Sequence, residues 1–277
     1  MTNSVNTNPG AMIALQNLNR TNMELEMVQN RINTGLEVAG AKDNGGIFAI
    51  AQRMRSNVSG YSAVTDSLNR AISTVDVALA AGEAISDLII EMKEKALAAA
   101  DTSLDTASRT ALNEDFKALR DQIKVIVANA EFNGSNLLDN SIASITALAN
   151  ADGSNTITVA DENFVLGSTG SQVTIASNAS FATATQADNI ASQLGTTLDN
   201  VNASLARLGT KSKSLGIHSA FVTKLSDALT TGIGNLVDAD MAKESAKLQA
   251  LQVKQQLGIQ ALGIANQSPQ AVLSFFR

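Results

Sequence analysis

A seven-residue repeat of apolar or small residues is the feature that most constrains the fold of this chain. It runs through Ile47, Met54, Tyr61, Leu68, Val75, Gly82, Ile89 and Ala96. A second row accompanies it at Ile50, Val64, Ala71, Ala78, Ile85 and Met92. The two prolines, Pro9 and Pro269, lie near the ends, so no proline breaks a helix between them. This spacing predicts one coiled-coil-like helix of about 50 residues, roughly 75–80 Å long.

A second repeat of the same period lies in the other half of the chain, at Leu194, Val201, Leu208, Leu215, Val222, Leu229 and Leu236. We expect the two seams to face each other as antiparallel neighbours. A shorter helix is predicted over about 106–129, where apolar residues fall at Leu112, Phe116, Leu119, Ile123 and Ile126. Only 3% of the residues are aromatic, which suits thin helix-on-helix seams better than a thick globular core.

The middle of the chain, about residues 134–184, has a different composition and is rich in Ser, Thr, Asn and Gly. Residues 156–159 and 172–175 have the pattern of short strands, and a turn at 151–154 precedes the first of them. We therefore expect a mainly α protein. It should be a long antiparallel helical bundle or coiled coil with a small β-hairpin region in the middle of the chain.

Both ends of the chain are predicted to form separate helical arms, one from about Val5 to Gly35 and the other over about 238–266. A glycine-containing linker, residues 40–46, follows the first arm. The heptad phase changes beside Gly232, before the second arm. These breaks predict two domains: terminal arms made of 1–46 and 232–277, and a helical bundle over 47–231 whose hairpin region faces outward.

The two arms carry apolar stripes and few charges, which has a consequence for assembly. A lone hairpin of two such helices cannot bury its apolar residues on both sides and is marginal in water. Burial against other copies solves this, so we predict self-assembly through the termini. Polar Asn22, Gln29 and Gln255 interrupt the stripes and should fix the register. The stripe residues expected to carry assembly are Leu15, Leu18, Leu25, Ile32, Met241, Leu248, Leu251 and Leu262.

Composition excludes several kinds of site. The absence of Cys rules out disulfides and thiolate chemistry, and the single histidine, His218, rules out a site that needs two imidazoles. We therefore expect no catalytic residues, metal or cofactor. The net charge of −6, with no basic patch, argues against nucleic acid. No apolar run is long enough to span a membrane, and the N-terminus lacks the pattern of a cleavable signal peptide.

Several separate motifs follow one another in order along the chain: Ser4–Asn8, Arg31–Leu36, Ala41–Asn44, Glu131–Gly134, Asp238–Glu244 and Pro269–Leu273. Together they resemble bacterial flagellin along nearly the whole sequence. The short length and sparse middle resemble the compact flagellins of alphaproteobacteria, which lack the large outer domains of enterobacterial ones.

The resemblance implies a filament subunit that is secreted unfolded through the flagellar type III apparatus and serves swimming motility. It implies that the arms form a coiled-coil core, that the bundle surrounds it, and that the chain assembles with itself as a helical homopolymer. Further implied partners are paralogous flagellins, the filament cap, the hook-junction proteins and an export chaperone that binds the C-terminal arm.

Hydroxyl side chains of the middle region are expected to be possible O-glycosylation sites by the same resemblance. They are Ser144, Thr146, Thr156, Thr169, Ser171, Ser177 and Thr183. Plain solvated loop residues are the simpler interpretation. Three other functions stay open at this point: a hook–filament junction protein related to flagellin, a secreted coiled-coil effector or adhesin, and, least favoured, an enzyme.

Overall fold

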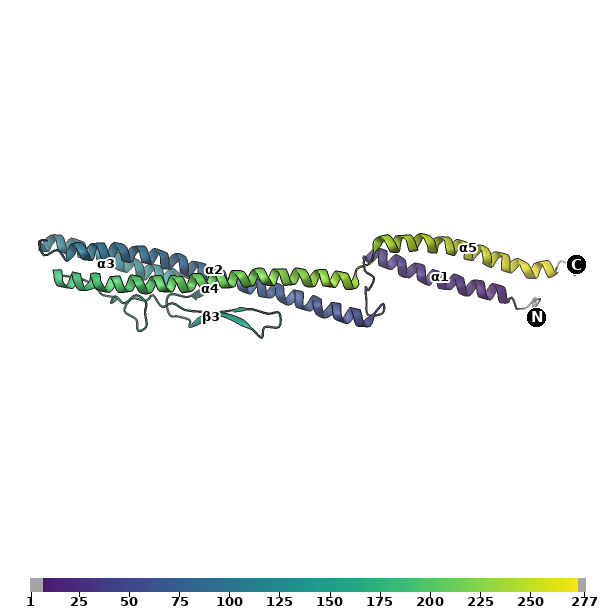
Figure 1. The fold of residues 1–277 in the computed structure, drawn as a ribbon, viewed down its shortest axis with the longest axis horizontal. Helices are drawn as coiled ribbons and strands as arrows, with labels where there is room; N and C mark the ends of the chain where they lie inside the picture. The colour runs from purple at the N-terminus through teal and green to yellow at the C-terminus, as the bar shows by residue number, and fades with distance from the viewer. Residues whose placement is uncertain (1–6, 274–277) are drawn as a thin grey trace. The chain divides into compact units, whose positions relative to one another are not determined.

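The computed structural model describes the backbone of residues 7–273 and the side chains of residues 7–267. The expected start of the first arm at Val5, part of the first motif, and the side chains of the Pro269–Leu273 motif lie outside the described residues. The described chain is mainly helical, with two small two-stranded sheets in its middle, as predicted (Figure 1). The elements are α1 Pro9–Thr34, α2 Gly45–Ala99, α3 Thr106–Asn129, β1 Glu131–Phe132, β2 Ser135–Asn136, β3 Ser144–Leu148, β4 Thr156–Ala160, α4 Ala184–Val237 and α5 Met241–Leu273.

The chain divides into two compact units, one made of residues 1–56 with 228–277 and the other of residues 57–227. Helices α2 and α4 contribute residues to both units. The domain boundaries expected from the heptad phase, at 46/47 and 231/232, stay a prediction.

In the second unit, α2 and α4 pack antiparallel along their heptad seams, as predicted. The Ser86 hydroxyl lies 3.5 Å from Asn202 Oδ1, and the Ser212 hydroxyl lies 3.2 Å from Asp76 Oδ1. The seam position of Gly82 leaves little room for a side chain, because Leu205 fills the space: a Cβ on Gly82 would lie 2.7 Å from Leu205 Cδ2. The core is formed by the seam residues of both helices, which are almost completely buried, among them Leu68, Val75, Ile89, Leu194, Val201 and Leu208.

Helix α3 has the bounds that its apolar spacing predicts. Its N-terminal cap is Asp105, whose carboxylate accepts a hydrogen bond of 2.8 Å from the Ser108 amide. Its inner face buries Phe116 and Ile123 in the same core, and the Phe116 ring centroid lies 5.2 Å from that of Phe181. The third helix thereby covers the α2–α4 seam that two helices alone would leave half open.

Two hairpins lie in the middle region. β1 and β2 pair around Asn133 and Gly134, which have positive φ of 51° and 80°, the conformation of a tight two-residue hairpin turn. β3 pairs antiparallel with β4 in the register Ser144↔Ala160. The predicted strand at 156–159 and its preceding turn are therefore confirmed, whereas the strand 144–148 that pairs with it was not recognised.

The predicted strand at 172–175 is wrong. Val173 and Ile175 are buried, which produces the alternation seen in the sequence, but the segment pairs with no strand in the described chain. Its polar groups bond elsewhere: the Gln172 amide donates to the Asn163 carbonyl at 2.8 Å, and the Thr174 hydroxyl lies 2.7 Å from that of Thr197 in α4. Alternating burial here reflects docking of an irregular segment onto the helical core.

In the first unit, α1 and α5 run side by side in opposite directions (Figure 1). Helix α1 ends at Gly35, whose φ of 72° closes the last turn. Helix α5 begins where the Asp240 carboxylate accepts hydrogen bonds from the Ala242 and Lys243 amides. It continues to Leu273, beyond the end at about residue 266 that the apolar pattern predicts. A small separate core of Val38, Ala51 and Val237 forms where the linker from α1 to α2 meets the linker from α4 to α5, which pair through Leu36 and Asp238.

Candidate assembly surface on the paired arms

The predicted assembly residues occupy two different environments on α1 and α5. Leu18, Leu25 and Ile32, seven residues apart, are half-buried, as are Leu248 and Leu262, and Leu251 is buried. The Leu18 side chain packs against α5 at Gly258: a Cβ added to this glycine would lie 3.3 Å from Leu18 Cδ1. Leu15 and Met241 are exposed, at 48% and 44%. Most of the stripe is therefore at least partly covered within one chain.

Polar contacts fix how the two arms align. The Gln255 side-chain amide donates a hydrogen bond of 2.8 Å to Asn22 Oδ1, and the Asn8 amide donates one of 2.6 Å to the Ala265 carbonyl. The structure thus brings together two of the three residues expected to set the register. The third, Gln29, lies exposed on α1.

A buried carboxylate links the two arms near the end of α1 and the beginning of α5. Glu244 on α5 is 4% exposed, and its Oε1 lies 3.5 Å from Arg31 Nη1 on α1 and 2.7 Å from Lys247 Nζ. Its Oε2 is buried with no hydrogen-bond partner. Truncating Arg31 would leave much of this charge uncompensated, so the pair specifies the alignment even where its net contribution to stability is small.

The faces of α1 and α5 that point away from each other also carry exposed apolar residues. On α1, Met12, Met23 and Met27 recur at helical spacing and are 63%, 63% and 50% exposed. On α5 the outward residues are Val253, Leu257 and Ile264, at 55%, 57% and 70%. We call these six residues the outer stripes. Both arms thus carry apolar residues on two opposite faces, and pairing covers only one of these faces.

The outer stripes were missed in the sequence because, of their members, only Leu257 and Ile264 lie seven residues apart. A search for apolar residues spaced by three, four or eleven would have found them, since these spacings return to one face of a helix. Few charges interrupt α1: its charged residues are Arg20, Glu24, Glu26 and Arg31. Low charge on an exposed apolar face is typical of a surface that another protein covers.

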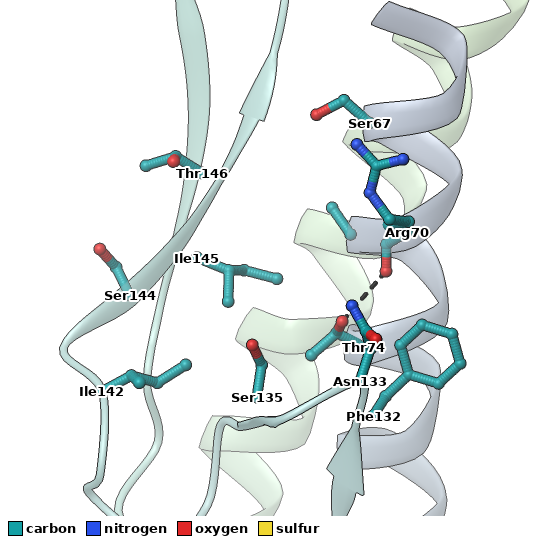
Figure 2. A pocket seen from close by; sticks show the side chains of 11 residues that line it. Ser67, Arg70, Thr74, Phe132, Asn133, Ser135, Ile142, Ser144, Ile145 and Thr146 are labelled. Carbon is teal, nitrogen blue, oxygen red and sulfur yellow. Dashed lines mark hydrogen bonds between the residues drawn. The ribbon is translucent and has the colours of Figure 1, made fainter. Parts of the chain in front are cut away.

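The second unit contains a hollow of about 350 Å³ between α2 and the two hairpins (Figure 2). Its lining is mostly polar and uncharged, with hydroxyls from Ser67, Ser144 and Thr146 and the guanidinium of Arg70. Within residues 7–267, no three His, Cys, Asp or Glu side chains are close enough together to hold a metal ion. The hollow offers no nucleophile paired with a base and no ligand set.

Three of the remaining residues singled out in the sequence have local hydrogen-bond partners: His218, Ser171 and Thr183. His218 Nε2 lies 2.8 Å from the Ala149 carbonyl oxygen, at the loop between β3 and β4. Among the expected glycosylation positions, the Ser171 hydroxyl bonds backbone groups and the Thr183 hydroxyl caps α4. The Ser144 side chain is half-buried. The other positions, Thr146, Thr156, Thr169 and Ser177, are exposed. No helix among the described residues is long and apolar enough to cross a membrane.

Comparison with known proteins identifies the family. Residues 5–143 match the bacterial flagellin N-terminal helical region, and residues 191–276 match the bacterial flagellin C-terminal helical region. Flagellin FljM of Caulobacter vibrioides is 54% identical over 275 residues, which cover 99% of each chain. The flagellin of Brucella melitensis is 37% identical over 99% of each chain.

The fold also recurs in a solved protein of Vibrio parahaemolyticus described as a flagellar hook-associated protein. The TM-score is 0.58 at 12% identity, over 71% of this chain and 100% of that one. This likeness shows the fold alone. The full-length relatives are flagellins, which favours the filament subunit over the junction protein, the effector or adhesin and the enzyme. The chain therefore belongs to the bacterial flagellin family, the non-enzymatic subunits of the extracellular flagellar filament that drives swimming.

Proposed function

We propose that the outer stripes of α1 and α5, together with Leu15 and Met241, are the surface through which copies of this flagellin pack in the filament. The observation that carries the proposal is the presence of apolar residues on the faces of both arms that their pairing leaves uncovered. In this arrangement the stripe residues that pairing covers hold the two arms of one subunit together: half-buried Leu18, Leu25, Ile32, Leu248 and Leu262, and buried Leu251.

The energetics favour many neighbours over one. Covering each outer-stripe residue is worth about 1–2 kcal/mol, so the six together supply roughly 6–12 kcal/mol. Association of two molecules costs about 4–15 kcal/mol in lost freedom before any gain appears. A single contact between two subunits is therefore marginal. A helical lattice, in which each subunit meets several others, repeats the gain and makes the arrangement stable.

The domain roles follow from the same proposal. Residues 1–46 and 232–277 form the filament core, and residues 47–231 form the surrounding bundle with the region 134–184 facing outward. Exposed Thr146, Thr156, Thr169 and Ser177 are then available for O-linked sugars. The hydroxyls of Ser171 and Thr183 are hydrogen-bonded to backbone groups, which makes these two residues poorer sites for O-linked sugars.

Membership of the flagellin family also suggests which proteins bind this chain before and during assembly. An export chaperone covers the C-terminal arm, whose outer stripe is apolar and would otherwise be exposed to water. The filament cap and hook-junction proteins meet the same arms at the two ends of the filament. Paralogous flagellins with the same arm residues can enter the same lattice.

Leu257→Glu tests the assembly surface. Glutamate is a good helix former, so α5 keeps its conformation, but a charge now stands on its outer stripe. The matched control is Gln256→Glu, which adds the same charge to an exposed polar position one residue away. We expect seeded polymerisation, followed by sedimentation and electron microscopy, to fail for Leu257→Glu and to proceed for the control. Filaments of Leu257→Glu at the unmodified critical concentration would refute the proposal.

A further inference from the structure

The exposed thioethers of α1 are the most readily oxidised side chains that the described structure presents to solvent. The chain has no Cys or Trp, so methionine carries all of its sulfur. Met92 is fully buried in the core of the second unit, Met54 is half-buried and Met241 on α5 is 44% exposed, whereas Met12, Met23 and Met27 are more exposed, at 63%, 63% and 50%. Met12 and Met23 lie about three helical turns apart and Met27 one turn further, so the three sulfurs share one face.

We propose that Met12, Met23 and Met27 form an oxidation site through which peroxide blocks subunit assembly. The inference rests on the proposed function, because it needs the outer stripe of α1 to become buried between subunits. In the step, a lone pair of the methionine sulfur attacks one oxygen of hydrogen peroxide and the O–O bond breaks. The sulfur gains that oxygen and is oxidised by two electrons to the sulfoxide. The proton of the transferred oxygen leaves with the departing hydroxide as water.

The sulfoxide acts through desolvation. A methionine thioether loses little when it leaves water, but the S=O group is a strong acceptor that must give up its water when a second subunit covers it. The other members of the outer stripes, Val253, Leu257 and Ile264, are apolar and offer it no donor. We therefore expect about a tenfold rise in the critical concentration for each sulfoxide that assembly would bury.

Partial oxidation of the full-length monomer tests the site without any substitution. The protein is treated with hydrogen peroxide until about half of the chains carry one sulfoxide, and is then polymerised from seeds and sedimented. Peptide mass spectrometry of both fractions should find sulfoxide at Met12, Met23 and Met27 enriched in the supernatant. Met92 should stay unoxidised in both. Equal sulfoxide content at the three positions in pellet and supernatant would overturn the proposal.

A variant and a repair step separate this effect from general damage. In Met12→Leu/Met23→Leu/Met27→Leu, peroxide should shift the critical concentration much less, relative to the same variant untreated, than it does in the unmodified protein. Met54→Leu is the control and should stay as sensitive as the unmodified protein. Methionine sulfoxide reductases of both epimer types, with a dithiol, should restore assembly of the oxidised protein. A triple variant with undiminished sensitivity would contradict the site.

Failure of the two proposals can be told apart. If Leu257→Glu polymerises normally, the arms are not the assembly surface and the proposed function fails. If Leu257→Glu blocks polymerisation but monomer oxidised at all three methionines polymerises normally, the surface stands and only the oxidation site is wrong.

Discussion

Asn136 links the end of α3 to the segment that follows it, and its removal gives a sharp test of the fold. Its side-chain amide donates a hydrogen bond of 2.7 Å to the Val127 carbonyl near the end of α3, and its Oδ1 accepts one of 2.8 Å from the Leu138 amide. Asn136 is 3% exposed, and the neighbouring Leu137 and Leu138 are fully buried. Asn136→Ala therefore leaves the Leu138 amide without its partner in a site closed to water, and leaves the Val127 carbonyl with only the longer bond of 3.4 Å from the Ala130 amide.

The expected cost follows from those two groups. The buried amide left unsatisfied costs about 1–3 kcal/mol and the lost bond to the carbonyl about 1 kcal/mol, so the substitution should lower the free energy of unfolding by about 2–4 kcal/mol. With a urea dependence of about 2 kcal/mol per molar, the midpoint of unfolding should fall by about 1–2 M.

The assay is urea unfolding of the monomer followed by far-ultraviolet circular dichroism, since the chain has no Trp for fluorescence. Asn129→Ala is the matched control. The Asn129 amide also donates a hydrogen bond of 2.8 Å, to the Val125 carbonyl, but on the exposed face of α3, where water replaces it. We expect a change below about 1 kcal/mol for this control. A midpoint for Asn136→Ala no lower than that of Asn129→Ala would refute the reasoning.

Three further predictions concern the second unit. Phe116→Ala should lower the free energy of unfolding by about 3–5 kcal/mol, because it empties a fully buried site against Phe181, and calorimetry measures the loss. Burial, followed by the neighbouring carboxylates, raises the pKa of Asp161, so the ionised side chain lowers the stability of the fold at neutral pH. Asp161→Asn should therefore raise the melting temperature at neutral pH. This gain should vanish as the pH falls below the ordinary aspartate pKa of 3.8, where the carboxyl is protonated in both the folded and the unfolded chain. Gly60→Ala puts a Cβ 2.7 Å from the Ala151 carbonyl oxygen, so hydrogen exchange in residues 149–155 should accelerate despite the better helix propensity of alanine.

The long helices could be predicted because one periodic signal specifies both their extent and the face they bury. The repeat from Ile47 to Ala96 gave α2 within a few residues at each end. Helix α3 was predicted with its observed bounds because its apolar spacing has the helical period throughout. Local periodicity suffices where a helix is long and its neighbours contact it along one seam.

The strands and the outer stripes needed tertiary information. The strand at 144–148 has only Ile145 and Ala147 as an alternating pair, too short a pattern to distinguish it from a loop. Val173 and Ile175 alternate well, yet they dock onto helices instead of a partner strand. On the arms, the sequence shows which residues are apolar, but only the pairing of α1 with α5 shows which of them it leaves uncovered.

The contact between Asn8 and Ala265 joins residues separated by 257 positions, nearly the full length of the chain. When the polypeptide emerges from one end to the other, as in synthesis or export, this contact can form only after nearly the whole chain has emerged. A chain that stops short of its final helix has the first arm but no partner to align it. The pairing of the two ends thus works as a check on length: a truncated molecule cannot present the composite two-helix surface of a complete one.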